Sequence, residues 1–358
     1  MFVRKIYLSF LLILCLFNNL QAEIERRAAF DLGSGSIKLL VADFDTDTET
    51  IEKYIYSRTA QISLSGDLAK KGDGLFSQNI QQEAKRIVHV LKLEADEHGA
   101  EHYAGVATEA YRLAQNGQEL LSQISHAEGF TIKLISQKEE AELGFATAVA
   151  HSKGNPHNAV VWDIGNGSFQ ITWMEEGHLN SYMKHLGKTP VKNLIISEVQ
   201  GKDTNDENSP NPISQDQFHL ARSLLINVLG EVPENLLAKI VHPSSDVYGV
   251  GAIHNGNITI STQQFRYTLE TVNGLITDRL DLPDTAFAVN APEFWVSDLI
   301  FISAVMSHLN IPSIINVKAF DDPNVASSGN TIGIIVWPEY WQQFILKLSS
   351  CIRCSEES

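Results

Sequence analysis

Residues 160–171 read Val-Val-Trp-Asp-Ile-Gly-Asn-Gly-Ser-Phe-Gln-Ile, and residues 28–39 read Ala-Ala-Phe-Asp-Leu-Gly-Ser-Gly-Ser-Ile-Lys-Leu. In both stretches an apolar run ends in an Asp, a short loop with two glycines follows, and a second strand-like segment comes next. This order predicts a strand, a tight turn and another strand. Asp163 and Asp31 are 132 residues apart (163 − 31 = 132), and the glycines and serine of the two loops keep the same register. One such hairpin in each half of the chain predicts two related domains that face each other across a cleft.

The glycine loops suit a phosphate-binding site. Glycine has no Cβ, so the backbone N–H groups of such a loop can converge on an anion, and positive φ costs little there. The serine hydroxyl adds a donor, and the Asp that ends the strand can hold a metal ion, directly or through water. A single loop of this kind is more often an ordinary hairpin turn. Two loops in register, each after an apolar strand, instead predict a pair that grips successive phosphates of one substrate.

The first 22 residues are typical of a secretory signal peptide. Arg4 and Lys5 precede a nearly continuous apolar run over residues 6–17, and residues 20–22 end on a small residue. An uncleaved N-terminal anchor is the alternative. No later stretch is long and apolar enough to span a bilayer. The mature protein is therefore expected to be secreted or periplasmic, with no stable membrane span after the signal is removed.

Removal of the signal would leave 336 residues (358 − 22), enough for two domains with their own cores. The net charge of the chain is −16, and loss of Arg4 and Lys5 makes it −18 (−16 − 2). This acidic balance argues against nucleic acid or an anionic membrane surface as the main partner. A polyanionic substrate would therefore need basic residues concentrated in the cleft, or a divalent cation.

Two cysteines remain after signal removal, Cys351 and Cys354, and both lie at the C-terminus. In an exported protein this pair is expected to form a small disulfide or to stay unpaired, and both alternatives are open. Two thiols alone cannot complete a zinc site. A redox function would want the pair at a helix start inside a fold, so none is predicted.

Strands and helices alternate in both halves of the chain. The hydrophobic spacing predicts a helix over residues 77–98 and a short buried strand over residues 103–107. Residues 59–74 are Gly-rich and predict an irregular segment, and residues 331–337 predict a late strand. The alternation predicts an α/β fold in which helices cover mixed sheets.

Two further segments carry candidate functional groups. Thr108 can cap a helix in which Arg112, one turn on, aims a planar fork of donors at phosphate, although a surface ion pair explains Arg112 equally well. Residues 137–142 place several acids at a helix start, where they complement the helix dipole. One of these carboxylates beside a phosphate site could instead orient or deprotonate a water molecule. Only the position of the helix relative to the loops separates these interpretations.

Four motifs fall in a familiar order and spacing: Asp31-Leu-Gly-Ser-Gly-Ser, Ala107-Thr-Glu-Ala-Tyr-Arg112, Ile135-Ser-Gln-Lys-Glu-Glu140-Ala and Asp163-Ile-Gly-Asn-Gly-Ser. Through them the chain resembles the exopolyphosphatase / guanosine pentaphosphate phosphohydrolase (Ppx/GppA) family of the actin-like ATPase (ASKHA) superfamily. The resemblance implies two ribonuclease-H-like domains, over residues 23–137 and 138–345, with the active cleft between them and a tail over residues 346–358. It also implies a phosphoric anhydride hydrolase that releases orthophosphate from polyphosphate or a phosphorylated nucleotide.

The resemblance further implies a role for each matching residue. Glu140 would be the base that activates water, and Arg112 would clamp the anion. Asp163 would hold Mg²⁺ or another divalent cation, and Asp31 would support the metal from the opposite loop. The phosphate-binding residues would be Ser34, Gly35, Ser36, Gly165, Asn166, Gly167 and Ser168. A homodimer is left open.

The chain also departs from the family pattern. Asn166 stands where the second loop usually has glycine, and Gly35 stands where the first loop usually has asparagine. Gln170 replaces a Glu near the metal and supplies no charge, which predicts weaker Mg²⁺ binding or slower turnover. Residues 251–253 read Gly-Ala-Ile in place of Gly-Gly-Thr. Gln170, Asn166 and the acidic surface keep open a catalytically impaired phosphate- or polyphosphate-binding protein. An ATP-using kinase or ATPase of the superfamily is a further alternative, which would need an adenosine-binding glycine motif of which Gly249-Val-Gly251 is only a fragment.

Overall fold

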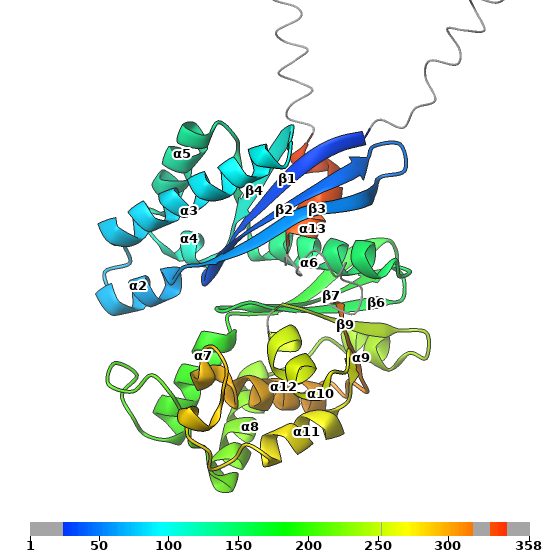
Figure 1. Ribbon diagram of the computed structural model, residues 1–358. Coiled ribbons are helices and arrows are strands. Elements are labelled where there is room, and N and C mark those ends of the chain that lie inside the picture. Colours follow the sequence, from blue (N-terminus) through cyan, green and yellow to red (C-terminus); the bar gives the residue numbers. More distant parts are fainter. Residues whose placement is uncertain (1–23, 252, 318–329, 342–358) are drawn as a thin grey trace, which may run out of the picture.

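The computed structural model describes residues 24–251, 253–317 and 330–341. The predicted signal peptide, the tail over residues 346–358 and both C-terminal cysteines lie outside these ranges. Figure 1 shows two lobes, each built on a β-sheet with helices. The first sheet has the strand order β3-β2-β1-β4-β5, and the second has the order β10-β11-β9-β6-β7-β8. The predicted α/β class with mixed sheets is confirmed. No helix in the described part of the chain is long and apolar enough to cross a membrane.

The first sheet comprises β1 (Ile24–Leu32), β2 (Ser36–Asp45), β3 (Thr50–Gln61), β4 (His102–Ala107) and β5 (Ile132–Leu134). Its helices are α2 (Leu64–Lys71), α3 (Gln78–Glu97), α4 (Glu109–Leu113) and α5 (Gly117–Glu128). The predicted helix over residues 77–98 is confirmed as α3. The prediction of an irregular segment over residues 59–74 is wrong, because α2 forms there. Leu64 anchors α2 in the core, Lys70 and Lys71 lie in its last turn, and Gly72 ends it in the left-handed conformation.

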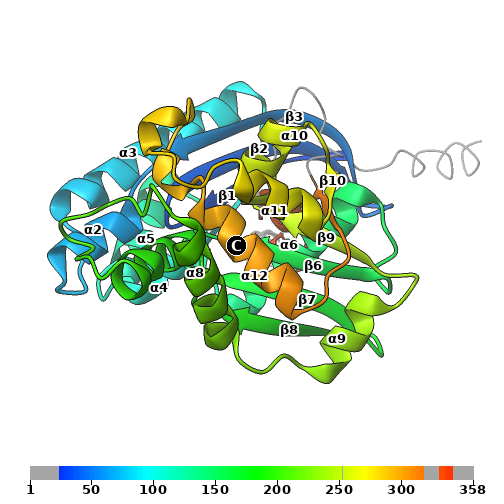
Figure 2. The same ribbon diagram turned by 90° about the horizontal axis from the view of Figure 1, so that it is seen from below.

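The second sheet comprises β6 (Ala159–Ile164), β7 (Phe169–Glu175), β8 (His178–Lys184), β9 (Asp246–Val250), β10 (Arg266–Tyr267) and β11 (Ile314–Asn316). Its longer helices are α7 (Lys188–Leu194), α8 (Gln215–Leu229), α9 (Glu234–Val241), α11 (Leu269–Thr277) and α12 (Ser297–His308). The short helical segments are η1 (Ile195–Val199), η2 (His254–Thr259), α10 (Ile260–Thr262), η3 (Asp284–Ala286) and η4 (Pro292–Phe294). Viewed from below, α8, α11 and α12 lie across the face of this sheet that is turned away from the first lobe (Figure 2).

The hairpins over residues 28–39 and 160–171 fold in the same way. In β1 and β2, Asp31 pairs with Lys38, and in β6 and β7, Asp163 pairs with Gln170 at the same offset of 132 residues (170 − 38 = 132). In each sheet the first strand of the hairpin also pairs in parallel with a later strand, β1 with β4 and β6 with β9. The lobes therefore repeat one core topology, as the duplicated sequence predicts.

Side-chain alternation along the strands decides where the two aspartates point. Phe30 of β1 packs with the core under α3, whereas its neighbour Ala29 faces the opposite side of the sheet. In β6, Trp162 packs with α12 and Val161 faces the other side, against Phe145 of α6 (Gln137–Ser152). Asp31 is two residues after Ala29, and Asp163 is two residues after Val161, so each aspartate faces the same side of its sheet as that residue. Both carboxylates therefore lie on the inner faces of the two sheets, where the lobes meet.

Two helices, α6 and α13 (Thr331–Val336), pack together between the sheets. The prediction of a strand over residues 331–337 is wrong. A short buried run of β-branched residues cannot be told from a helix by its pattern, and the packing against α6 decides. Gly333 permits the close approach, because a Cβ there would lie 2.4 Å from the carbonyl oxygen of Leu143. The apolar side chains of α13 join the core of the first sheet, although the predicted domain boundaries assign α13 to the second domain. A last turn, η6 (Pro338–Tyr340), follows.

Candidate active site

The first glycine loop, residues 33–36, is held from behind by the start of the following segment. The backbone N–H of Gly33 donates to the carbonyl of Ser36 at 2.9 Å and closes the turn. The carbonyl of Ser34 accepts from Leu64 N at 3.1 Å, and the carbonyl of Gly35 accepts from the N–H of residue 62 at 3.1 Å. No described hydrogen bond engages the N–H groups of Ser34 and Gly35. The carbonyls of the loop thus bind other parts of the protein, while the N–H groups of Ser34 and Gly35 stay free.

The second glycine loop, residues 165–168, repeats the arrangement. Gly165 N donates to Ser168 O at 2.9 Å. The carbonyls of the loop accept hydrogen bonds from the start of α7. Gly187 N donates to Gly167 O at 2.9 Å, Lys188 N to Gly165 O at 3.2 Å, and Thr189 N to Asn166 O at 2.9 Å. Among the described contacts, the N–H groups of Asn166 and Gly167 also have no acceptor. Adjacent backbone N–H groups left free in a turn are available to bind an anion.

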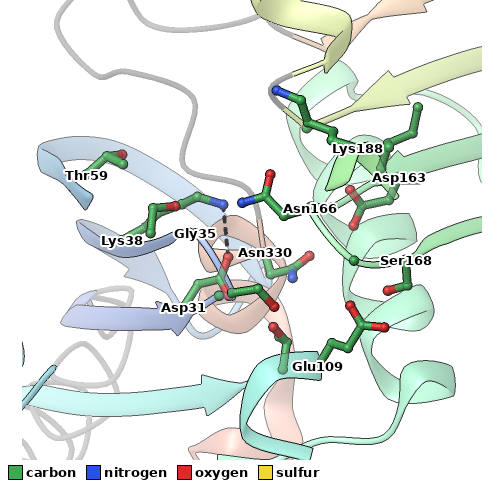
Figure 3. Close-up of a pocket in the computed structure, with 18 of the residues that line it drawn as sticks. Asp31, Gly35, Lys38, Thr59, Glu109, Asp163, Asn166, Ser168, Lys188 and Asn330 are labelled. Atoms are coloured by element: carbon green, nitrogen blue, oxygen red, sulfur yellow. Dashed lines mark hydrogen bonds and ion pairs between the residues drawn. The ribbon is translucent and has the colours of Figure 1, made fainter. Parts of the chain in front are cut away.

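Both loops line one cavity of about 490 Å³, and the close-up in Figure 3 shows residues of the two lobes facing each other across it. The predicted residues on its wall are Asp31, Ser34, Gly35, Ser36, Glu140, Asp163, Gly165, Asn166, Gly167 and Ser168. Arg112 is not on the wall. Ser34 and Ser168 therefore share one cleft, which is the arrangement the phosphate hypothesis requires.

Side chains cross the cleft and occupy the space above two glycines. A Cβ on residue 35 would lie 1.8 Å from Nδ2 of Asn166, and a Cβ on residue 167 would lie 1.4 Å from Oε2 of Glu109. Asn166 reaches from the second loop to the first, and Glu109 reaches from α4 of the first lobe to the second loop. A larger residue at position 35 or 167 would displace the end of Asn166 or of Glu109 from this position. The Asn166 amide and the Glu109 carboxylate thus each reach from one lobe to the other.

Glu109 lines the cavity, although the sequence pattern did not identify it as a site residue. The buried carboxylate lies 3.1 Å from Nδ1 of His185, a residue of the second lobe, and the neighbouring Ala110 N donates to Oγ of Ser34 at 3.2 Å. Glu109 is the first residue of α4, directly after β4. An acid in the first turn of a helix is common for electrostatic reasons, so the sequence carries no signal for its contact with the other lobe.

Glu140 lies in the first turn of α6, where the Ser136–Glu139 capping box fixes the helix start. Burial raises the pKa of Glu140 to about 8, since Arg112 only partly offsets burial and the nearby negative charges of Asp163 and Asp31. Arg112 donates to Oε2 of Glu140 at 3.0 Å and to the carbonyl of residue 135 at 2.8 Å. In these contacts the Arg112 guanidinium holds the Glu140 carboxylate in place. The predicted role of Arg112 as an anion clamp stays a prediction.

The two aspartates differ in their neutralisation. Oδ2 of Asp31 accepts from Nζ of Lys38 at 3.2 Å, while Oδ1 of Asp31 is buried without a hydrogen-bond partner. Burial raises the pKa of Asp163 to about 6, with Lys38 opposing and Asp31 adding to the rise. The raised pKa of Asp163 and the unpaired oxygen of Asp31 favour a cation bound beside these two carboxylates.

Two lysines on the cavity wall, Lys38 and Lys188, supply the basic groups that an acidic chain needs to bind an anion. Lys38 follows Ser36 by two residues on β2 and so lies on the same face. Lys188 is the first residue of α7, and its Nζ lies 3.1 Å from a carboxylate oxygen of the buried Asp298 and 4.7 Å from the ring centroid of Phe294. The acidic net charge of the chain predicts basic residues in the cleft but does not identify them.

The donor set at Asp31 and Asp163 fits a hard divalent cation. No group of three or more His, Cys, Asp or Glu side chains in the described residues is placed to hold a metal ion by itself. Mg²⁺ does not need such a cage, because it retains several waters and binds through one or two carboxylates together with substrate phosphates. The unpartnered oxygen of Asp31, opposite Asp163 in one cavity, matches that mode of binding.

The fold and the opposed loops define a two-lobed α/β protein with a phosphate-sized cleft, and comparisons with known proteins agree. A structure of the Aquifex aeolicus PPX-GPPA enzyme superposes with a TM-score of 0.67 at 18% identity, covering 88% of this chain and 99% of that chain. An exopolyphosphatase from Cytophaga hutchinsonii gives a TM-score of 0.65 at 17% identity, covering 87% of this chain and 96% of that chain. At these identities the likeness establishes the fold.

The family follows from the sequence. The model of the Ppx/GppA phosphatase family matches residues 45–318, more than half of the chain, and the chain belongs to this family. A bifunctional 3-dehydroquinate synthase/phosphatase of Fusobacterium nucleatum is 28% identical over 151 residues, which are 41% of this chain. The match spans only 22% of the length of that relative.

Proposed function

We propose that this chain is a phosphohydrolase that releases orthophosphate from polyphosphate or from a phosphorylated nucleotide. One observation carries the proposal: two glycine loops from different lobes line one cavity, with free N–H donors on both and Glu140 on the same wall. Successive phosphates bound between the loops would take hydrogen bonds from Ser34 and Gly35 on one side and from residues 166–168 on the other. Such pre-oriented donors stabilise transferring phosphoryl groups without reorganisation.

Glu140 is proposed as the base for the attacking water. Its carboxylate is buried and fixed by Arg112, so its orientation is set before substrate arrives. A carboxylate with a raised pKa accepts a proton from water more readily than an ordinary one, once it is itself deprotonated. Asp31 and Asp163 would hold a Mg²⁺ ion, which supplies positive charge to the phosphoryl oxygens when bound. Lys38 would balance Asp31 and leave its second oxygen for the cation.

The test is orthophosphate release in the presence of Mg²⁺, with polyphosphate and nucleoside polyphosphates as substrates. Glu140→Gln removes the base and keeps the shape, so its rate should fall by about a hundredfold or more, which is the size of a general-base contribution. Glu142→Gln, on the same helix and off the cavity wall, is the matched control and should keep the wild-type rate. Equal rates in wild type and Glu140→Gln would exclude the assignment.

A second candidate is a phosphate-binding protein that has lost turnover. Gln170 supports it, because its side chain is 1% exposed, donates to Oγ of Ser168 at 3.2 Å and brings no charge to the cleft. Under this alternative, polyphosphate binds but no orthophosphate appears, and Asp163→Ala abolishes binding. Calorimetry with polyphosphate, run beside the release assay, separates the two candidates.

We also propose export as the setting of this activity, on the basis of the signal-like residues 1–22. Substrate would then be met outside the cytoplasm, which favours polyphosphate and scavenged phosphoesters. N-terminal sequencing of the protein from fractionated cells tests this proposal. An N-terminus at Met1 in the cytoplasmic fraction would contradict it.

A further inference from the structure

A buried amide of the cavity wall has no role in the proposed hydrolysis so far. Asn330 lines the cavity with a relative exposure of 6%, and its Oδ1 is buried without any hydrogen-bond partner. A buried polar atom left unpaired costs about 1–3 kcal/mol. Oδ1 of Asp31, on the same cavity wall, is buried and unpaired in the same way. Two unsatisfied oxygens in one cleft indicate a ligand that both would contact.

The helix that follows Asn330 fixes its position, although Oδ1 of its amide accepts no hydrogen bond from any residue that the structure describes. The residue immediately precedes α13, yet its side chain makes no capping hydrogen bond to that helix. The helix is fixed to α6, since Gly333 N donates to Oγ1 of Thr147 at 2.9 Å and Gly333 lies against the backbone of Leu143. The helix α6 also carries Glu140. A helix packed between both sheets thus delivers the Asn330 amide to a defined place in the cleft.

The surroundings of Asn330 decide what kind of ligand its oxygen would bind. Figure 3 shows the Asn330 side chain in the gap between Asp31 on one side and Asp163 and Ser168 on the other. An oxygen atom that only accepts, set among carboxylates, attracts a cation or a water molecule held by one. Amide oxygens are ordinary ligands of hard divalent cations, together with carboxylates and waters.

We propose that Oδ1 of Asn330 is a ligand of the divalent cation in the cleft, together with Asp31 and Asp163. This inference rests on the proposed function, because it concerns the cation of that site. A neutral third ligand also explains how the cation is held without a third carboxylate. Gln170 supplies no charge, and the described residues contain no cluster of three acidic or His/Cys ligands.

The test measures cation binding directly, without substrate and without turnover. Mn²⁺ is the probe, and free Mn²⁺ is followed by electron paramagnetic resonance for wild type, Asn330→Leu and Asn330→Asp. Asn330→Leu keeps the volume and removes the oxygen, so the dissociation constant for Mn²⁺ should rise about tenfold or more, the scale on which even an outer partner of a metal matters. Asn330→Asp keeps an oxygen and adds charge, so it should bind Mn²⁺ at least as tightly as wild type. Asn235→Leu, on the exposed face of α9, controls for an added leucine and should leave the affinity unchanged.

Urea unfolding without metal separates a ligand from a packing residue. Because Oδ1 has no partner in the protein, Asn330→Leu should keep or raise the urea midpoint. Unchanged Mn²⁺ affinity in Asn330→Leu overturns the inference, and so does a wild type that binds no Mn²⁺. A lower midpoint in Asn330→Leu together with weak binding in Asn330→Asp assigns the residue to packing and also overturns it. A wild type that binds Mn²⁺ through Asn330 but releases no orthophosphate refutes only the hydrolase.

Discussion

Gly187→Ala tests whether the second glycine loop is positioned by contact with α7. Gly187 has φ of −106°, which any residue adopts, so alanine brings no backbone strain. Its Cβ would lie 2.6 Å from Gly165 O, 2.6 Å from Ser168 N and 2.7 Å from the carbonyl carbon of Asn166. These are backbone atoms of the loop and cannot rotate away. The loop itself must therefore move.

The size of the effect follows from what that movement disturbs. Relieving contacts of 2.6 Å to an ordinary 3.4 Å needs a shift of about 0.8 Å (3.4 − 2.6). Overpacking of this kind typically costs about 1–3 kcal/mol. The hydrogen bonds from Gly187, Lys188 and Thr189 to the loop carbonyls would lengthen as well, at about 1 kcal/mol for each one lost. We expect the free energy of unfolding to fall by about 2–4 kcal/mol.

Urea denaturation followed by circular dichroism measures this loss, and orthophosphate release measures its consequence for the site. Gly274→Ala is the matched control, because Gly274 lies within α11 and a Cβ there meets nothing within 4 Å. That substitution should stabilise the protein by about 0.5–1 kcal/mol through helix propensity. If Gly187→Ala unfolds within about 0.5 kcal/mol of wild type, the loop is not fixed by α7 and the reasoning is refuted.

Three more predictions concern charge. The rate of orthophosphate release should rise with pH and show an inflection near 8, because Glu140 acts as a base only when deprotonated and burial raises its pKa to about 8. The pH profile of Glu140→Gln should lack this inflection. Burial lowers the pKa of His254 to about 3, so as the pH falls below 6.5 only the unfolded state takes up a proton at this residue. The free energy of unfolding should therefore fall by up to about 1.4 kcal/mol per pH unit. Urea titrations between pH 7 and 4 measure this loss, which should be smaller in His254→Phe. Lys188→Met leaves the buried carboxylate of Asp298 without its cation, so the free energy of unfolding measured by urea denaturation should fall by about 3–5 kcal/mol. The double variant Lys188→Met/Asp298→Asn should recover part of this loss, and a wild-type midpoint in Lys188→Met would contradict the pairing.

The duplicated hairpins and the shared cleft were predictable from sequence because their signal is local and repeated. The Asp, the glycines and the serine recur at one offset, and strand alternation sends Asp31 and Asp163 to the inner faces of their sheets. The Glu140 helix was predictable for a similar reason, since the acids of its first turn and its capping box are contiguous. In each case the local structure around a residue follows from neighbours within a few positions.

The rest of the site depends on contacts between segments that are distant in the chain. The helix α13 reads as a strand because a short run of buried isoleucines fits either structure, and only its packing on α6 selects the helix. Asn330 reaches the cleft through that packing. Glu109 contacts the opposite lobe through Gly167 and His185, which no local pattern encodes. Tertiary contact assigns these residues to the site.

The two loop departures from the family pattern form a single feature in three dimensions. The family usually has asparagine at the position of Gly35 and glycine at the position of Asn166, so the two residue types are exchanged here. A Cβ on residue 35 would lie 1.8 Å from Nδ2 and 3.1 Å from Cγ of Asn166, and the Asn166 amide therefore fills the space where a side chain of residue 35 would begin. A side chain on residue 35 would require the Asn166 amide to take another position, so glycine in the first loop is compatible with asparagine in the second.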